Sequence, residues 1–182
     1  LEWLANHRSE VSEPELRDRV SALPVFPSAS GELRKLTELS LPSDFEDVLE
    51  VADVVHPGKV SGYTDLLRRL GATELDAAEY LTRHVDRVAA LGLLGPEKAT
   101  AVLRLIDRHH ANLAGVRDDL GRMRLVPCKD GVVRPATEVH LPNRALTLIA
   151  PDAPIADVGQ LGEHLRSTLI WLGVSDHPSD QV

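Results

Sequence analysis

The sequence predicts an α+β chain made of two tandem copies of a helix–β-hairpin–helix module joined by helices. Three observations predict this fold: a gap-free internal repeat, a proline-bounded apolar strand with a glycine turn in each copy, and amphipathic stretches between the copies. We expect the first module to span residues 1–94 and the second residues 95–182, with the boundary near Gly95.

The repeat has an offset of 100 residues. Segment 16–42 matches segment 116–142 without a gap, and after a two-residue slip Leu70-Gly71-Ala72 corresponds to Leu172-Gly173-Val174. A match of this length without a gap indicates a duplication. The positions identical in both copies are Arg17/Arg117, Asp18/Asp118, Pro27/Pro127, Gly31/Gly131, Arg34/Arg134, Thr37/Thr137, Glu38/Glu138, Leu41/Leu141 and Pro42/Pro142.

Each copy begins with a short amphipathic helix, and Pro14 lies near the start of the first one. Apolar strands over 23–26 and 125–126 follow, each stopped by a proline, which cannot donate to a ladder. Gly31 and Gly131 supply the positive φ that the hairpin turns demand. We expect a second extended segment over 32–41 and over 132–141.

Two amphipathic helices are predicted between the repeated segments. The first covers residues 75–94, and the second begins at Pro96 and covers residues 96–113. Together with the closing helices, they supply the helical part of the predicted α+β fold.

Composition excludes several classes of function. The 28 acidic residues outnumber the 20 basic ones, so a phosphate backbone is repelled and we expect no nucleic-acid partner. No apolar run approaches the roughly 18 residues that a membrane span needs. The single cysteine, Cys128, rules out an internal disulfide and favours a reducing, cytoplasmic location. Because the chain starts at Leu1 without methionine, we interpret it as a piece of a longer polypeptide.

We predict no catalytic, cofactor-binding or metal-binding residues. Asp107 and His110 share a helix face, but His109 points elsewhere, and a zinc site needs three or four converging ligands. Cys128 has no histidine near it in the sequence and corresponds to Ser28, so we interpret it as a turn residue and not a nucleophile. The glycine-rich motifs of nucleotide sites are absent, so we expect no cofactor in this segment.

Candidate contact points recur in both copies. We expect Glu38 and Glu138 to act locally, by bonding to backbone groups or by pairing with Arg34 and Arg134; the alternative is an interaction surface that is repeated twice. The turns at Gly31 and Gly131 are predicted to project equivalently from the two modules and to form repeated contact points for other proteins.

A family resemblance rests on the hairpin segments. The stretches LPVFPSASGEL at 23–33 and LVPCKDG at 125–131 each lead to Glu-Leu/Val-x-Leu-Pro and later to Leu-Gly-Ala/Val. They resemble the repeats of sacsin and of large bacterial proteins that carry a histidine-kinase-like ATPase domain of the ninety-kilodalton heat-shock type. The resemblance implies a segment downstream of that domain. The family's acidic–Asn helix and Asp-x-Gly-x-Gly loop have no match here.

The sequence therefore predicts a non-enzymatic segment of a larger chaperone-like ATP-binding protein. It would act as a scaffold or contact region whose partners are protein clients or neighbouring domains of the same chain. The alternative is a stand-alone interaction spacer in a bacterial defence or regulatory protein. An enzyme with an unrecognised site ranks last, because it requires a deep polar pocket with perturbed titratable groups.

Overall fold

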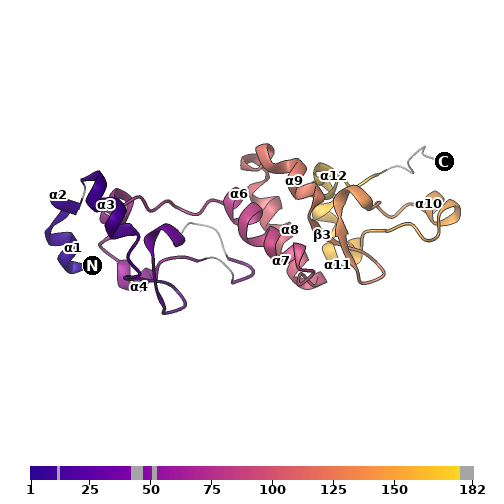
Figure 1. Cartoon of the computed structure of the whole chain (residues 1–182). Helices are drawn as coiled ribbons and strands as arrows, with labels where there is room; N and C mark the ends of the chain where they lie inside the picture. Colours follow the sequence, from indigo (N-terminus) through magenta and orange to yellow (C-terminus); the bar gives the residue numbers. More distant parts are fainter. Residues whose placement is uncertain (12, 42–46, 51–52, 177–182) are drawn as a thin grey trace. The chain divides into compact units, whose positions relative to one another are not determined.

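A computed structural model describes residues 1–11, 13–41, 47–50 and 53–176 (Figure 1). The chain divides into two compact units, which are described separately. Unit 1 comprises residues 1–45 and 52–76, and unit 2 comprises residues 46–51 and 77–182. Each unit contains helices and one small antiparallel hairpin, which confirms the predicted α+β class.

Unit 1 places a two-stranded sheet among short helices. Pro14 begins α3, as expected for a residue whose missing N–H is harmless in a first helical turn. The elements of unit 1 are α1 (Glu2–Asn6), α2 (Arg8–Val11), α3 (Pro14–Ser21), β1 (Phe26–Pro27), β2 (Leu33–Arg34), η1 (Leu36–Glu38), α4 (Pro57–Val60) and α5 (Thr64–Arg69).

Unit 2 contains the same succession of helix, hairpin and closing helices, with further helices before it and with α10 after its hairpin. Pro96 begins its longest helix, which buries the face formed by Ala99, Val102, Leu103 and Ile106. The elements of unit 2 are α6 (Ala77–Glu79), the π-helical η2 (Tyr80–Val85), α7 (Asp86–Ala90), α8 (Pro96–His109), η3 (His110–Asn112), η4 (Ala114–Val116), α9 (Arg117–Arg122), β3 (Arg124–Pro127), β4 (Val133–Pro135), η5 (Ala136–Glu138), α10 (Arg144–Ile149), α11 (Val158–Leu161), η6 (Glu163–Leu165) and α12 (Arg166–Leu172).

The division between the units falls at Asp76 and Ala77, whereas the sequence analysis placed the module boundary near Gly95. Residues 77–94 therefore belong to unit 2. The reason is packing: α7 and α8 both contact β3 in the hairpin of unit 2. A period of 3.6 residues reveals a buried helix face, but it does not identify the element that the face packs against.

The second strand of each hairpin is shorter than predicted. Instead of one extended segment over 32–41 and 132–141, the 3-10 turns η1 and η5 interrupt the chain. The amide of Leu39 donates to the carbonyl of Leu36, and that of Val139 donates to the carbonyl of Ala136. These turns direct Leu36 and Ala136 inward, where each is almost fully buried. Core packing therefore overrides the extended conformation at these positions.

The duplication is visible in the backbone hydrogen bonds. The amide of Ser40 donates to the carbonyl of Asp53, and that of His140 donates to the carbonyl of Pro154, both at 2.9 Å. The amides of Leu41 and Leu141 donate to the carbonyls of Thr73 and Ser175, both at 2.8 Å. The offset between equivalent residues of the two copies is thus 100 in the hairpins, 101 at residues 53–56 of unit 1 and 102 at residues 66–73 of unit 1. Two one-residue steps account for the slip seen in the sequence.

Both modules end in the same helix stop. Gly71 and Gly173 have φ values of +97° and +107°, and their amides bond to the preceding helical turns of α5 and α12. The amides of Ala72 and Val174 donate to the carbonyls of Leu67 and Leu169 at 2.9 Å. A left-handed glycine closed by such bonds is a common C-terminal helix cap.

The two copies differ where α9 approaches α12. A β-carbon added to Gly121 would lie 2.5 Å from the carbonyl oxygen of Leu172. Its counterpart in unit 1 is Ser21, which is buried and donates from Oγ to the carbonyl of Asp18. Glycine at position 121 therefore lets the backbone of α9 lie close to that of α12. Unit 1, with a serine at this position, has no such close approach.

Gly121→Ala should destabilise unit 2 by about 1–3 kcal/mol, because the clash with a backbone carbonyl outweighs the roughly 1 kcal/mol gain in helix propensity. Urea unfolding followed by Trp171 fluorescence, in a chain carrying Trp3→Phe, measures this effect. Ser21→Ala is the matched control and should change stability by no more than about 1 kcal/mol. Equal stability of Gly121→Ala and the parent would contradict the close approach.

Candidate functional site

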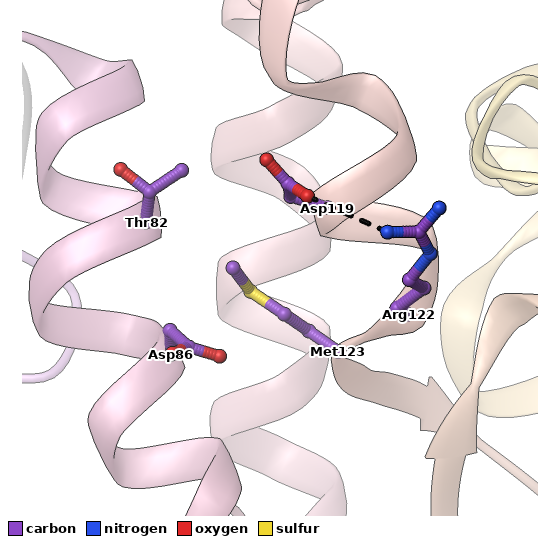
Figure 2. A pocket seen from close by; sticks show the side chains of 5 residues that line it. All are labelled: Thr82, Asp86, Asp119, Arg122 and Met123. Atoms are coloured by element: carbon purple, nitrogen blue, oxygen red, sulfur yellow. Dashed lines mark ion pairs between the residues drawn. The ribbon is translucent and has the colours of Figure 1, made fainter.

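A cleft in unit 2 lies between the segment formed by η2 and α7 and the end of α9 (Figure 2). Its volume is about 290 Å³, and Thr82, Asp86, Asp119, Arg122 and Met123 line it. Asp119 and Arg122 form an ion pair at 3.9 Å, while the hydroxyl of Thr82 donates to the carbonyl of Ala78. Asp119 is therefore paired with Arg122, and the hydroxyl of Thr82 is bonded to the backbone. An activated nucleophile would instead donate its hydroxyl proton to a neighbouring base.

A second cleft, of about 220 Å³, is lined by Asp107 and His110, two of the three residues that the sequence analysis weighed as metal ligands. The hydroxyl of Thr168 donates to Asp107, and the ring of His110 packs edge-on against Trp171 with centroids 6.3 Å apart. Within the described residues, no three His, Cys, Asp or Glu side chains gather in a way that could hold a metal ion. Asp107 thus accepts from a hydroxyl and His110 packs on an indole ring, so these side chains join α8 and η3 to α12.

Cys128 occupies the first position of the second hairpin turn and is buried. Its burial raises the pKa of the thiol, and Arg134 only partly opposes that change. Because the thiolate is the nucleophile, a raised pKa makes the side chain less reactive. Its counterpart, Ser28, is equally buried, so both side chains face the inner side of their turns.

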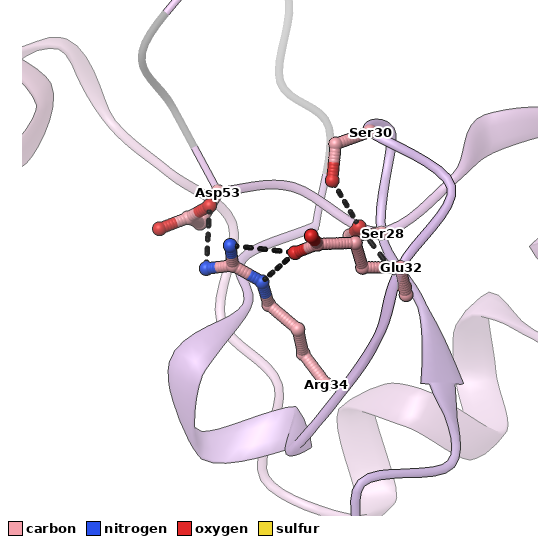
Figure 3. Close-up of polar contacts among 5 residues, drawn as sticks. All are labelled: Ser28, Ser30, Glu32, Arg34 and Asp53. Carbon is pink, nitrogen blue, oxygen red and sulfur yellow. Dashed lines mark hydrogen bonds and ion pairs between the residues drawn. The ribbon is translucent and has the colours of Figure 1, made fainter.

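The turn of unit 1 is held by a compact set of polar contacts (Figure 3). The amide of Gly31 donates to the carbonyl of Ser28, and Gly31 has a φ of +88°. The hydroxyl of Ser28 lies 2.8 Å from that of Ser30 and 3.0 Å from the carbonyl oxygen of Glu32. Side chain and backbone therefore fix the same four-residue turn.

Arg34 joins this turn to the neighbouring extended segment (Figure 3). Its guanidinium donates to Glu32 at 2.9 and 3.2 Å and to Asp53 at 3.0 Å. The hydrogen bonds that Arg34 donates to Glu32, followed by the charge of Asp53, raise the pKa of Arg34. The sequence suggested Glu38 as its partner, but Glu38 forms its ion pair with Lys35, at 3.5 Å.

The turn of unit 2 uses the same backbone with different side chains. Gly131 has a φ of +80°, and its amide donates to the carbonyl of Cys128 at 2.9 Å. Arg134 binds both carboxylate oxygens of Asp130, at 2.7 and 2.8 Å, and Asp130 also accepts from the amide of Val132. These bonds, chiefly those from Arg134, lower the pKa of Asp130 to about 2.

The six predicted contact residues thus fall into two separate, equivalent groups. Arg34 and Arg134 each fasten a turn, while the side chains of Glu38 and Glu138 are exposed at the ends of η1 and η5. Sequence reasoning missed the true partners of the arginines, namely Glu32, Asp53 and Asp130. Asp130 could have been found from its i,i+4 spacing to Arg134, whereas Asp53 is near Arg34 only because of the fold.

Comparisons with protein-family models, with curated proteins and with solved structures give no match to this chain. The resemblance to sacsin-like repeats therefore stays a prediction from the residues of the two hairpins. Within the described residues, no helix is both long and apolar enough to cross a bilayer.

Asp130→Asn tests the electrostatic role of the second turn. The pKa of Asp130 is lower in the folded chain than the ordinary value of 3.8, so its contribution to stability is present above about pH 4 and is lost as pH falls toward 2. The stability difference between Asp130→Asn and the parent, measured by urea unfolding, should narrow over that range. In an Arg134→Gln background most of this pH dependence should disappear. A difference that stays constant with pH would contradict the assignment.

Proposed function

We propose that this chain is a non-catalytic scaffold that contacts other proteins through its two hairpins. The observation that carries the proposal is that each hairpin exposes an apolar side chain, and α10 of unit 2 exposes another. Leu33 in unit 1 is 62% exposed, and in unit 2 Val132 and Leu148 are 48% and 80% exposed. A bound protein would remove these side chains from water, which favours association.

The construction of the turns supports the same proposal. Both turns are held by matching backbone bonds, so their conformation is set before a partner binds. A contact that is ordered in advance loses less entropy on association. The exposed turn residues are Ala29 and Ser30 in one copy and Lys129 and Asp130 in the other. Two turns of the same backbone conformation therefore expose different side chains.

In a protein of the kind that the sequence resembles, such a segment would lie downstream of an ATPase domain and contact clients or neighbouring domains. We place it in the cytoplasm, where the unpaired thiol of Cys128 would stay reduced. Its role would be to link nucleotide-driven movement elsewhere to protein contacts here, without binding the nucleotide itself.

The contact proposal can be tested with an unfolded client, for which reduced and carboxymethylated α-lactalbumin is a suitable probe. A Leu33→Lys, Val132→Lys variant should bind the immobilised probe at least about tenfold more weakly than the parent, because charges replace the exposed apolar groups of the two hairpins. Leu91→Lys with Leu93→Lys is the matched control, since both leucines are 65% exposed outside the hairpins. Equal loss in the control, or no binding by the parent, would overturn the proposal.

Calorimetric titration of ATP with magnesium into the chain tests the separation from nucleotide binding. We expect no saturable heat, because the glycine-rich backbone cradle of nucleotide sites has no match in the sequence. Saturable binding at millimolar concentration or below would instead favour an enzyme with an unrecognised site, and substitutions around the clefts of unit 2 would then locate it.

A further inference from the structure

One short segment belongs to a different unit from the residues on both sides of it. Unit 2 includes residues 46–51, whereas residues 1–45 and 52–76 form unit 1. The chain of unit 1 therefore contributes a segment to unit 2 and then returns to unit 1. Of this segment the structure describes residues 47–50, which we call the strap.

The strap is a turn that one tyrosine hydroxyl holds. The amide of Glu50 donates to the carbonyl of Asp47 at 3.2 Å, which closes the turn. The hydroxyl of Tyr80 donates to the carboxylate of Asp47 at 2.6 Å and accepts from the amide of Leu49 at 3.2 Å. The hydroxyl thus uses both its proton and a lone pair on the same turn. These two bonds fix the strap against the start of η2, where Tyr80 lies.

Tyr80 is a fixed part of unit 2. Its side chain is fully buried, and it is the first residue of the π-helical η2. Turns of π-helix are rare and occur frequently at functional sites. Burial, followed by the hydrogen bond to Asp47, raises the pKa of Tyr80, so the hydroxyl keeps its proton and remains a donor. A buried hydroxyl is costly unless it is hydrogen-bonded, so the strap satisfies a polar group of unit 2.

The strap also places an apolar side chain in unit 2. Leu49 is only 7% exposed. In the second copy, the corresponding stretch between the hairpin and the segment that bonds to it contains α10, where Leu148 and Ile149 are 80% and 73% exposed. Burial in this stretch is therefore not common to the two modules. Leu49 is buried where the strap packs in unit 2, and its removal from water favours docking.

The backbone of the strap carries strain. Among the described residues, Glu50 alone combines a side chain with a positive φ, of +54°. Residues other than glycine adopt this left-handed conformation infrequently, because the β-carbon then approaches the following carbonyl oxygen. Such a conformation persists only where the surrounding contacts enforce it. Here those contacts are the closing bond to Asp47 and the two bonds of Tyr80.

Docking of the strap affects a hydrogen bond of unit 1. The amide of Ser40 donates to the carbonyl of Asp53 at 2.9 Å, and this bond closes the loop that contains the strap. Closing a loop costs conformational entropy, because its two ends must be brought together. When the strap is docked, the middle of the loop is already fixed, so less entropy is lost when Ser40 and Asp53 meet. Docking in unit 2 thus stabilises a bond in unit 1.

We propose that the strap couples the two units, so that its docking on Tyr80 in unit 2 stabilises the folded loop of unit 1. Both ends of the strap continue into unit 1, so the coupling needs no further contact. The strained turn is released as one piece, because its bonds to unit 2 converge on a single hydroxyl. Release loosens residues 53–56, which bond to the hairpin of unit 1. The coupling does not depend on the contact role proposed for the hairpins.

Amide hydrogen exchange followed by NMR measures the strap and the loop under native conditions. Tyr80→Phe removes the hydroxyl and keeps the buried ring. The amide of Leu49 loses its acceptor and should exchange at least about tenfold faster. The amide of Ser40 should exchange at least about threefold faster, whereas that of the equivalent His140 in unit 2 should not change.

A control and a second variant separate the coupling from a general loss of stability. Tyr63→Phe is the matched control, since Tyr63 is the other tyrosine of the chain and lies in unit 1. It should leave exchange at Leu49 unchanged. Asp47→Ala should also speed exchange at Ser40. Combined with Tyr80→Phe it should add little, because both substitutions remove the same bond.

The proposal requires both effects of Tyr80→Phe. Unchanged exchange at Leu49 would show that the hydroxyl does not hold the strap. Unchanged exchange at Ser40, or equal acceleration at Ser40 and His140, would show that the strap does not couple the units.

Discussion

Each hairpin depends on a third extended segment that forms hydrogen bonds to it. In unit 1 the amide of His56 donates to the carbonyl of Pro27, and in unit 2 that of Asp157 donates to the carbonyl of Pro127. The amide of Lys129 likewise donates to the carbonyl of Ile155. A hairpin of two short strands is marginal in water on its own, so these bonds from outside the hairpin make it a stable element. The prolines suit this role. The hairpin bonds continue past them, from the amides of Ser28 and Cys128 to the carbonyls of Glu32 and Val132, while the proline carbonyls accept from the third segment.

The sequence predicted the parts of this construction that depend on local chemistry. Gly31 and Gly131 have the positive φ that a tight turn requires, and Pro14 and Pro96 begin helices, because these preferences belong to the residue itself. The third segment was not predicted, since residues 53–56 join the hairpin chiefly through backbone hydrogen bonds, which leave no pattern in the sequence. The contact residues were located, but their partners were not, because Asp53 meets Arg34 only after the chain has folded back.

The two copies differ in sequence where different elements pack against them. Proline and glycine, whose backbone properties are unusual, occupy two of the differing positions. Pro24 stands where unit 2 has Arg124, the first residue of β3, and β1 begins two residues later at Phe26. A proline lacks the amide needed for the ladder, so the strand of unit 1 is shorter. Ser21 and Gly121 differ in the same way: the glycine permits α12 to approach α9 more closely than a side chain would allow. The shared hydrogen bonds are retained while the packing around them varies.

The two copies keep the same backbone hydrogen bonds but carry different side chains around them, as a scaffold with repeated modules requires. Each turn is held by backbone bonds together with side-chain bonds, from Ser28 in unit 1 and between Arg134 and Asp130 in unit 2. The side chains of Ala29 and Lys129 take no part in these bonds. Exposed positions of this kind can change without loss of fold, because most surface substitutions alter stability by less than about 0.5 kcal/mol. A turn that tolerates change would suit the contact role proposed for the two hairpins.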